Sequence, residues 1–171
     1  MIIGEKILRD MYPNLDEEQY QPNSIDLKLE KLEGFVDAFD EIGMMNGEKH
    51  LPRMFDYLPL EEHDGKIVYG ISPHTACLAT IEGVMKIPDN VMQLYYLRSS
   101  LMRMGISMMS CVGDSGFNGH LKFLLINNTD NLVLIGKGER IATAVSYLVA
   151  DSGTYKGDYN EWFKNYKAWH W

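Results

Sequence analysis

The chain has 171 residues, which is enough for one domain with a substantial core but too few for two domains of ordinary size. Hydrophobic residues account for 46% of it, a fraction typical of globular proteins and too high for a disordered one. The formal net charge of −8 argues against a surface that coats nucleic acid, because such a surface usually needs a basic face. We therefore expect a single domain over residues 1–171, without nucleic acid as a partner.

The two cysteines, Cys77 and Cys111, are too few for a disulfide framework. Charged residues interrupt the apolar ones at the start of the chain, unlike in a secretory signal. No run approaches the roughly 18 apolar residues that are needed to span a bilayer. We expect a cytoplasmic protein that does not associate with membranes.

The first thirty residues predict one helix and one strand. Residues 2–12 carry apolar side chains at helical spacing, which indicates a short amphipathic helix that Pro13 ends. Residues 21–30 are typical of a loop entering a strand that has alternate apolar residues on one face. Asp26 points away from that face, and we interpret it as a solvated strand carboxylate.

The middle and later parts of the chain predict many short strands. Residues 34–64 show only small apolar pieces between turn residues, and the isolated His50 and His63 lack the partners of a zinc site. Clearer strands are expected at residues 66–71, 76–81, 91–97, 106–111, 121–126, 132–135 and 141–149. This pattern, with almost no long helix, predicts an all-β barrel or sandwich.

The tail over residues 151–171 is too aromatic for a loose linker. Its aromatic residues are Tyr155, Tyr159, Trp162, Phe163, Tyr166, Trp169 and Trp171. Such a segment either packs on a neighbouring surface or closes over a ligand.

An anion-binding pattern occurs between residues 98 and 103. Arg98, Ser99, Ser100 and Arg103 bring two guanidinium groups and two hydroxyl groups together within six positions. Arginine contacts phosphate oxygens in a bidentate manner, and serine adds short donors. In a negatively charged protein, this cluster would concentrate positive potential locally.

A glycine-rich turn follows at residues 113–119. It holds three glycines, the carboxylate of Asp114 and the ring of Phe117. Glycines permit positive φ and close approach of the backbone to a ligand. Phosphate donors followed by a carboxylate in a tight hairpin suggest a site that holds a polyphosphate and activates a water molecule. The alternative is a polar segment followed by an ordinary hairpin.

Four segments resemble, in order, the four motifs of the dUTPase and dCTP deaminase superfamily. They are QPNSIDLKL, LRSSLMRMGI, VGDSGFNGHLKFLLIN and KGERIATAVSYLV. The resemblance covers most of residues 21–160. The second motif looks more like the deaminase branch and its archaeal-type dUTPase relatives than the short dUTPases.

The resemblance implies a mainly β structure, a dUTPase-like β-barrel or distorted jelly roll with a short N-terminal helix. It implies a homotrimer with active sites at the subunit interfaces. It also implies a deoxynucleoside triphosphate as ligand, with Mg²⁺ bound mainly through the nucleotide phosphates and not by protein ligands.

The resemblance also assigns roles to residues. Arg98, Ser99 and Ser100 would hold phosphates, with Arg103 beside them. Asp114 matches the aspartate that orients and deprotonates the attacking water in dUTPases.

The nucleoside would lie against the same hairpin. Phe117 matches the ring that packs on the deoxyribose and leaves no room for a 2′-hydroxyl, with Ser110 and Gly113 beside the sugar and base. The tail resembles the tyrosine-bearing segment that folds over the nucleotide in the deaminase-like branch. The residues that would close the site are Tyr155, Lys156 and Tyr159.

Two departures from the deaminase pattern affect the chemistry. Deaminases of this family carry a glutamate ten residues after the aspartate, where this chain has Leu124. Zinc-free deamination needs a group that carries protons, which leucine cannot do. The family's alanine four residues before the aspartate, which leaves space for the water, is Ser110 here.

We therefore expect a deoxynucleoside triphosphate diphosphohydrolase that converts dUTP to dUMP and pyrophosphate through water activated by Asp114. One alternative is a dCTP deaminase, monofunctional or bifunctional, with another proton carrier such as His120. Another is a catalytically silent regulator that binds a deoxynucleotide. A pure binding module has no need of Asp114, which argues against the regulator.

Overall fold

A computed structural model describes residues 1–36, 42–63 and 65–157. Helix α1 (Glu5–Met11) confirms the helix predicted near the N-terminus, and Leu8 anchors it in the core. A single 3₁₀ turn, η1 (Glu17–Gln19), leads into β1 (Tyr20–Gln21). None of the helices in the described ranges is long and apolar enough to cross a membrane.

Strands make up most of the remaining structure, as the sequence predicts. The first group is β2 (Ser24–Phe35), β3 (Gly43–Met45), β4 (Glu48–His50), β5 (Met54–Asp56), β6 (Glu61–His63), β7 (Lys66–Ile71), β8 (Ala76–Ile81) and β9 (Met85–Lys86). The second group is β10 (Val91–Leu97), β11 (Ile106–Met109), β12 (Asn118–Gly119), β13 (Lys122–Asn127), β14 (Val133–Gly136) and β15 (Arg140–Leu148). The short helix α2 (Ser99–Arg103) lies between β10 and β11, within a segment for which the sequence predicted no helix.

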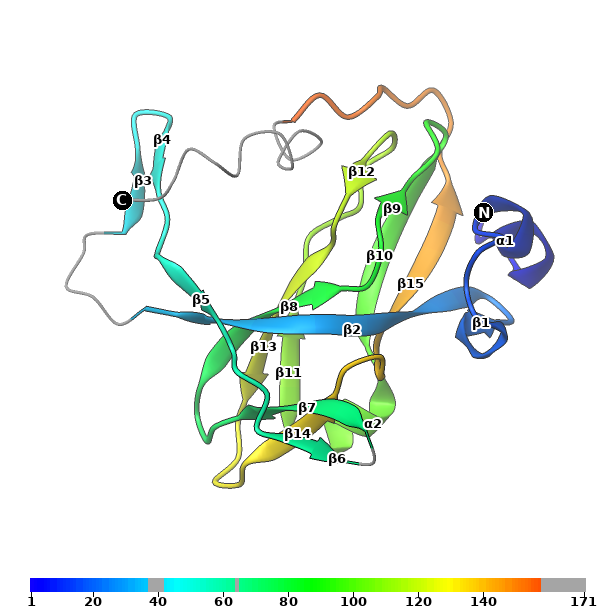
Figure 1. The fold of residues 1–171 in the computed structure, drawn as a ribbon. Coiled ribbons are helices and arrows are strands. Elements are labelled where there is room, and N and C mark those ends of the chain that lie inside the picture. The colour runs from blue at the N-terminus through cyan, green and yellow to red at the C-terminus, as the bar shows by residue number, and fades with distance from the viewer. Residues whose placement is uncertain (37–41, 64, 158–171) are drawn as a thin grey trace.

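The main sheet is antiparallel and curves into a nearly closed barrel (Figure 1). Its strand order is β10-β15-β2-β8-β13-β11, with β1 and β5 added to β2. The chain just after β11 returns to β10, where Gly113 and Gln93 exchange two backbone hydrogen bonds of 2.8 and 2.9 Å. This bridge joins the two edges and confirms the all-β barrel prediction.

Smaller sheets flank the barrel. Strands β14, β7 and β6 form one of them, β9 pairs with β12, and β3 pairs with β4 in a hairpin that extends from the barrel (Figure 1).

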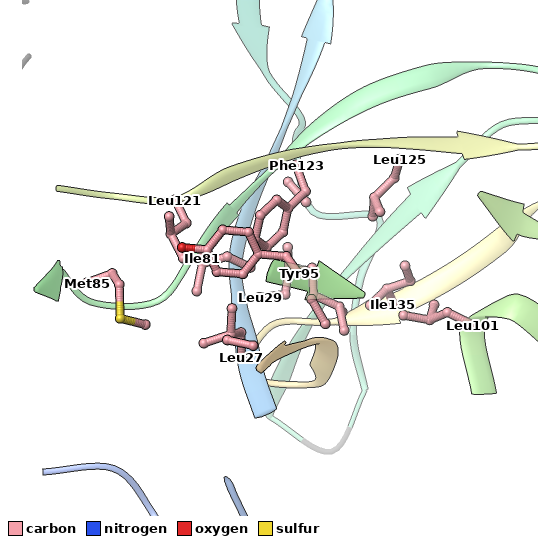
Figure 2. Close-up of a cluster of buried hydrophobic side chains, with 14 of the residues drawn as sticks. Leu27, Leu29, Ile81, Met85, Tyr95, Leu101, Leu121, Phe123, Leu125 and Ile135 are labelled. Atoms are coloured by element: carbon pink, nitrogen blue, oxygen red, sulfur yellow. The ribbon is translucent and has the colours of Figure 1, made fainter. Parts of the chain in front are cut away.

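The barrel interior is filled by alternate residues of the main strands. On β2, Ile25, Leu27 and Leu29 are at most 2% exposed. Figure 2 shows Leu27 and Leu29 in the buried cluster, in which the rings of Tyr95 and Phe123 lie with centroids 5.0 Å apart. Burying such side chains stabilises the fold by about 1.5–3 kcal/mol each. This packing holds β10, β13 and the hairpin between them in a fixed relation.

Candidate functional site

The predicted phosphate-binding residues lie at the end of β10. Arg98 occupies the N-cap position of α2, and its backbone N–H donates to the Ile141 carbonyl at 3.1 Å. Leu101 anchors the helix in the core. Ser99 and Ser100 are exposed in the first turn. The two serines and Arg98 are therefore gathered at one exposed end of the barrel, with Arg103 exposed at the last position of α2.

Asp26 is not solvated, which corrects the interpretation made from the sequence. It is 2% exposed, because its side chain lies beneath the polar groups of β15 and the start of α2. One carboxylate oxygen pairs with Arg98 at 3.0 Å and with Arg140 at 3.3 Å, and the other accepts a hydrogen bond from the Thr143 hydroxyl at 2.7 Å. A buried carboxylate needs such partners, so Asp26 orients both guanidinium groups. The signal available in the sequence was its place inside the first motif.

The glycine-rich hairpin lies at the other end of β10. A Cβ at Gly113 would collide with the Tyr95 hydroxyl and with Ile87, so this position requires glycine. Gly116 has a φ of +80°, which other L-residues adopt only with strain. The buried Ser115 hydroxyl donates to the Val91 carbonyl at 2.8 Å. Backbone geometry and close packing thus hold the hairpin in place.

Asp114 and Phe117 line a cavity of about 770 Å³, a size within the usual range for small-molecule sites. Asp114 itself is exposed. The cavity is bounded by the hairpin and by side chains of the sheet formed by β2, β8 and β13. Of the other sugar and base candidates, Gly113 lines the cavity, whereas the Ser110 hydroxyl donates to the Tyr95 carbonyl at 3.2 Å and is not among the lining residues.

A buried polar chain supports the hairpin from inside the barrel. The Tyr95 hydroxyl donates to the Gln93 side-chain oxygen at 3.0 Å, and the Gln93 amide donates to Tyr12 and Ser146, each at 3.0 Å. Burial raises the pKa of Tyr95, and the nearby Tyr12 and Asp114 raise it further. Tyr95 is therefore a neutral phenol beneath the Asp114 carboxylate.

The first part of the C-terminal tail lies against the hairpin. The Tyr155 backbone N–H donates to the Ser115 carbonyl at 2.7 Å, and its ring meets Phe117 edge-on with centroids 5.7 Å apart. Tyr155 also lines the cavity, which places this closure candidate at the site. Lys156 is exposed and is not among the lining residues. Tyr159 lies outside the described residues.

Leu124 has apolar neighbours. It is paired across the sheet with Leu78 on β8 and with Met109 on β11. The residue at the position of the deaminase glutamate is therefore apolar, and so are its direct partners on both neighbouring strands. His120 lines the cavity, and its Nδ1 lies 3.9 Å from a carboxylate oxygen of Glu30.

The two halves of the predicted site lie apart within one chain. Gly113 is bridged to Gln93, and Arg98 follows Gln93 by five residues along β10, a separation of about 17 Å at about 3.3 Å per residue. In Figure 1, α2 and the β12 hairpin accordingly lie at opposite ends of the barrel. None of the four predicted phosphate-binding residues lines the cavity. A single chain therefore places the four phosphate-binding candidates, which we call the clamp, and the Asp114 carboxylate at separate locations.

The chain is similar to known proteins over most of its length. The model of the dCTP deaminase-like family matches residues 3–146. A probable deoxyuridine 5′-triphosphate nucleotidohydrolase of Methanopyrus kandleri is 37% identical over 93% of this chain and 99% of its own. A dCTP deaminase of Pyrobaculum calidifontis is 34% identical, but only over 52% of this chain and 51% of its own.

The fold has a relative among solved structures. A dCTP deaminase from Agrobacterium tumefaciens superposes with a TM-score of 0.64 at 17% identity, over 98% of this chain and 53% of the other. At this identity the likeness concerns the fold alone. Together with the family match over most of its length, it shows that this chain belongs to the dCTP deaminase-like family.

Proposed function

We propose that this protein hydrolyses dUTP to dUMP and pyrophosphate by attack of water on the α-phosphorus. The observation that carries the proposal is the contrast between Asp114, exposed at a nucleotide-sized cavity beside Phe117, and the apolar Leu124, paired across the sheet with Leu78 and Met109. The site retains the group that hydrolysis needs and lacks the glutamate that deamination needs. The dUTP nucleotidohydrolase name of the relative from Methanopyrus kandleri supports the same choice.

In this mechanism, the Asp114 carboxylate orients a water molecule and accepts its proton as the water oxygen bonds to the α-phosphorus. The bond between that phosphorus and the α,β-bridging oxygen breaks, and pyrophosphate leaves with the bonding electrons. Arg98, Ser99 and Ser100 would bind the phosphate oxygens and stabilise the charge that they carry in the transition state. The ring of Phe117 would pack on the deoxyribose, with Tyr155 packed edge-on against that ring.

Magnesium would be bound through the substrate. Within the described ranges, no three His, Cys, Asp or Glu side chains gather closely enough to hold a metal ion. Magnesium commonly binds substrate phosphates with few protein ligands, and there it would neutralise part of the phosphate charge. We expect EDTA to abolish turnover and added Mg²⁺ to restore it.

The separation of clamp and cavity supports a site shared between subunits. We propose a homotrimer in which the α2 residues of one subunit face the hairpin cavity of a neighbour. A cyclic arrangement lets each subunit supply one half of two different sites. Light scattering of the purified protein should give the mass of three chains.

Subunit mixing tests this arrangement directly. Arg98→Ala and Asp114→Asn proteins should each be nearly inactive, but an equal mixture after subunit exchange should recover about a quarter of the wild-type activity. Random pairing gives that fraction of interfaces an intact clamp from one chain and an intact carboxylate from the other. An exchanged mixture that remains inactive would show that each chain builds its own site.

The activity itself is tested by incubating the pure protein with each deoxynucleoside triphosphate and Mg²⁺. We expect pyrophosphate and dUMP from dUTP, and no ammonia from dCTP. Ammonia release without hydrolysis of dUTP would replace the proposal with a deaminase that uses another proton carrier. Binding without turnover of any nucleotide would indicate a regulator.

The free thiols of Cys77 and Cys111 support our further proposal of a cytoplasmic location.

A further inference from the structure

A charged cluster lies on the sheet side of the same cavity. Lys31 on β2, Thr80 on β8 and Lys122 on β13 occupy one row across the sheet, because Thr80 is paired with both lysines. All three line the cavity. Next to them, the Glu33 carboxylate is only 2% exposed.

Glu33 holds this row together. It accepts a hydrogen bond from the Thr80 hydroxyl at 3.0 Å and one from the Lys122 ammonium, and Lys31 lies 3.5 Å away. Burial by itself would raise the pKa of Glu33, but its contacts with Lys122 and Thr80 lower it below the ordinary value. The carboxylate is therefore ionised at neutral pH and fixes the Lys122 ammonium at the cavity wall.

Lys122 on the sheet and Phe117 on the hairpin line the same cavity, which suggests which part of a nucleotide the ammonium would meet. The proposed function assigns the deoxyribose to Phe117, and the cavity continues from there to the sheet, so a base that fills the cavity would extend toward Lys122. The atom of a pyrimidine ring farthest from the sugar is at position 4. Uracil carries a carbonyl oxygen there, whereas cytosine carries an amino group. An ammonium has donors and no acceptor, so it favours the carbonyl and disfavours the amino group.

We propose that Lys122, held by Glu33, determines the base preference of this cavity by donating a hydrogen bond to the position-4 carbonyl of uracil. The inference rests on the proposed function, because it takes the cavity as the nucleoside site. Lys122 is a specificity-determining residue in this assignment and takes no part in bond breaking. Glu33 is a positioning residue that acts through it.

Binding of non-hydrolysable nucleotides tests the proposal without depending on turnover. We would measure the affinities of the α,β-imido analogues of dUTP and dCTP for the full-length protein in the presence of Mg²⁺. In Lys122→Met, the preference for the uracil analogue over the cytosine analogue should fall by about tenfold, the effect of losing one charge-assisted hydrogen bond. The loss should appear as weaker binding of the uracil analogue, with no weakening of the cytosine analogue.

Two further variants separate specificity from folding. Lys122→Arg keeps a cationic donor and should retain most of the preference. The double variant Glu33→Gln/Lys122→Met leaves no buried unpaired carboxylate, so it should fold even where Lys122→Met does not. It should show the same loss of preference. Lys66→Met, on an exposed position of β7, is the matched control and should change nothing.

Equal weakening of both analogues, or an unchanged ratio in a folded variant, would overturn the role of Lys122. Absence of pyrophosphate release from dUTP by the wild type would instead overturn the proposed function. The two failures are read from different measurements and are therefore distinguishable.

Discussion

The two ends of β10 show two ways of building half of a site. At the α2 end, ion pairs fix the positions of the side chains, because Arg98 and Arg140 share the buried carboxylate of Asp26. At the hairpin end, close packing and backbone hydrogen bonds fix the backbone, because Gly113 lies against Tyr95 and is hydrogen-bonded to Gln93. Removing a charge at the α2 end should therefore affect stability as well as function. At the hairpin end, replacing the exposed carboxylate of Asp114 should affect function without changing stability.

The largest effect is expected at the exposed carboxylate. Asp114→Asn keeps the shape of the side chain and loses its ability to accept a proton, so turnover of dUTP should fall by at least about a hundredfold. Nucleotide affinity and the midpoint of thermal unfolding should remain close to those of the wild type. Hydrolysis at near the wild-type rate would show that Asp114 is not the base.

The shape requirement of the hairpin gives the next prediction. Gly113→Ala introduces a methyl group against the Tyr95 hydroxyl and Ile87, which should destabilise the fold by about 1–3 kcal/mol. Gly153→Ala is the matched control, because a Cβ there meets nothing within 4 Å. Denaturant unfolding of both variants measures the difference, and equal stabilities would contradict the packing argument.

At the α2 end, Arg98→Ala should change two properties together. It weakens phosphate binding, which raises KM and lowers kcat for dUTP. It also leaves Asp26 with only Arg140 and Thr143, which should cost about 1–2 kcal/mol of stability. Arg103→Ala, at an exposed position of the same helix, should leave the stability unchanged. An Arg98→Ala protein as stable as the wild type would contradict the expectation that charge pairs at the α2 end contribute to stability.

The smallest effect concerns the two thiols. Burial raises the pKa of Cys77 to about 12, so little thiolate forms there at pH 8, and its side chain is fully buried. Cys111 is exposed and lines the cavity. We expect iodoacetamide at pH 8 to modify Cys111 and spare Cys77, as mass spectrometry of digested protein would show. A bound dUTP analogue should slow the reaction at Cys111, and modification that is indifferent to it would place the nucleotide elsewhere.

Local patterns predicted much of the fold. Alternating apolar residues placed the strands from residue 66 onward to within a few positions, because alternate residues of each strand face the same core. The helix over Ser99–Arg103 was missed, since a single turn of five residues carries too little periodicity to detect. The motifs indicate Asp114, Phe117 and Tyr155 as site residues, and the structure places all three around one cavity.

The fold class, the family resemblance and the chemical types of the site residues can be predicted from the amino-acid sequence, because these depend on local pattern and motif. The environments of those residues depend on tertiary packing. A strand pattern shows which face a carboxylate is on but not what covers it, so the burial of Asp26 and Glu33 was not evident from the sequence. Likewise, only the path of β10 through the barrel separates Arg98 from Asp114, because two motifs that are close in the sequence can lie at opposite ends of a strand.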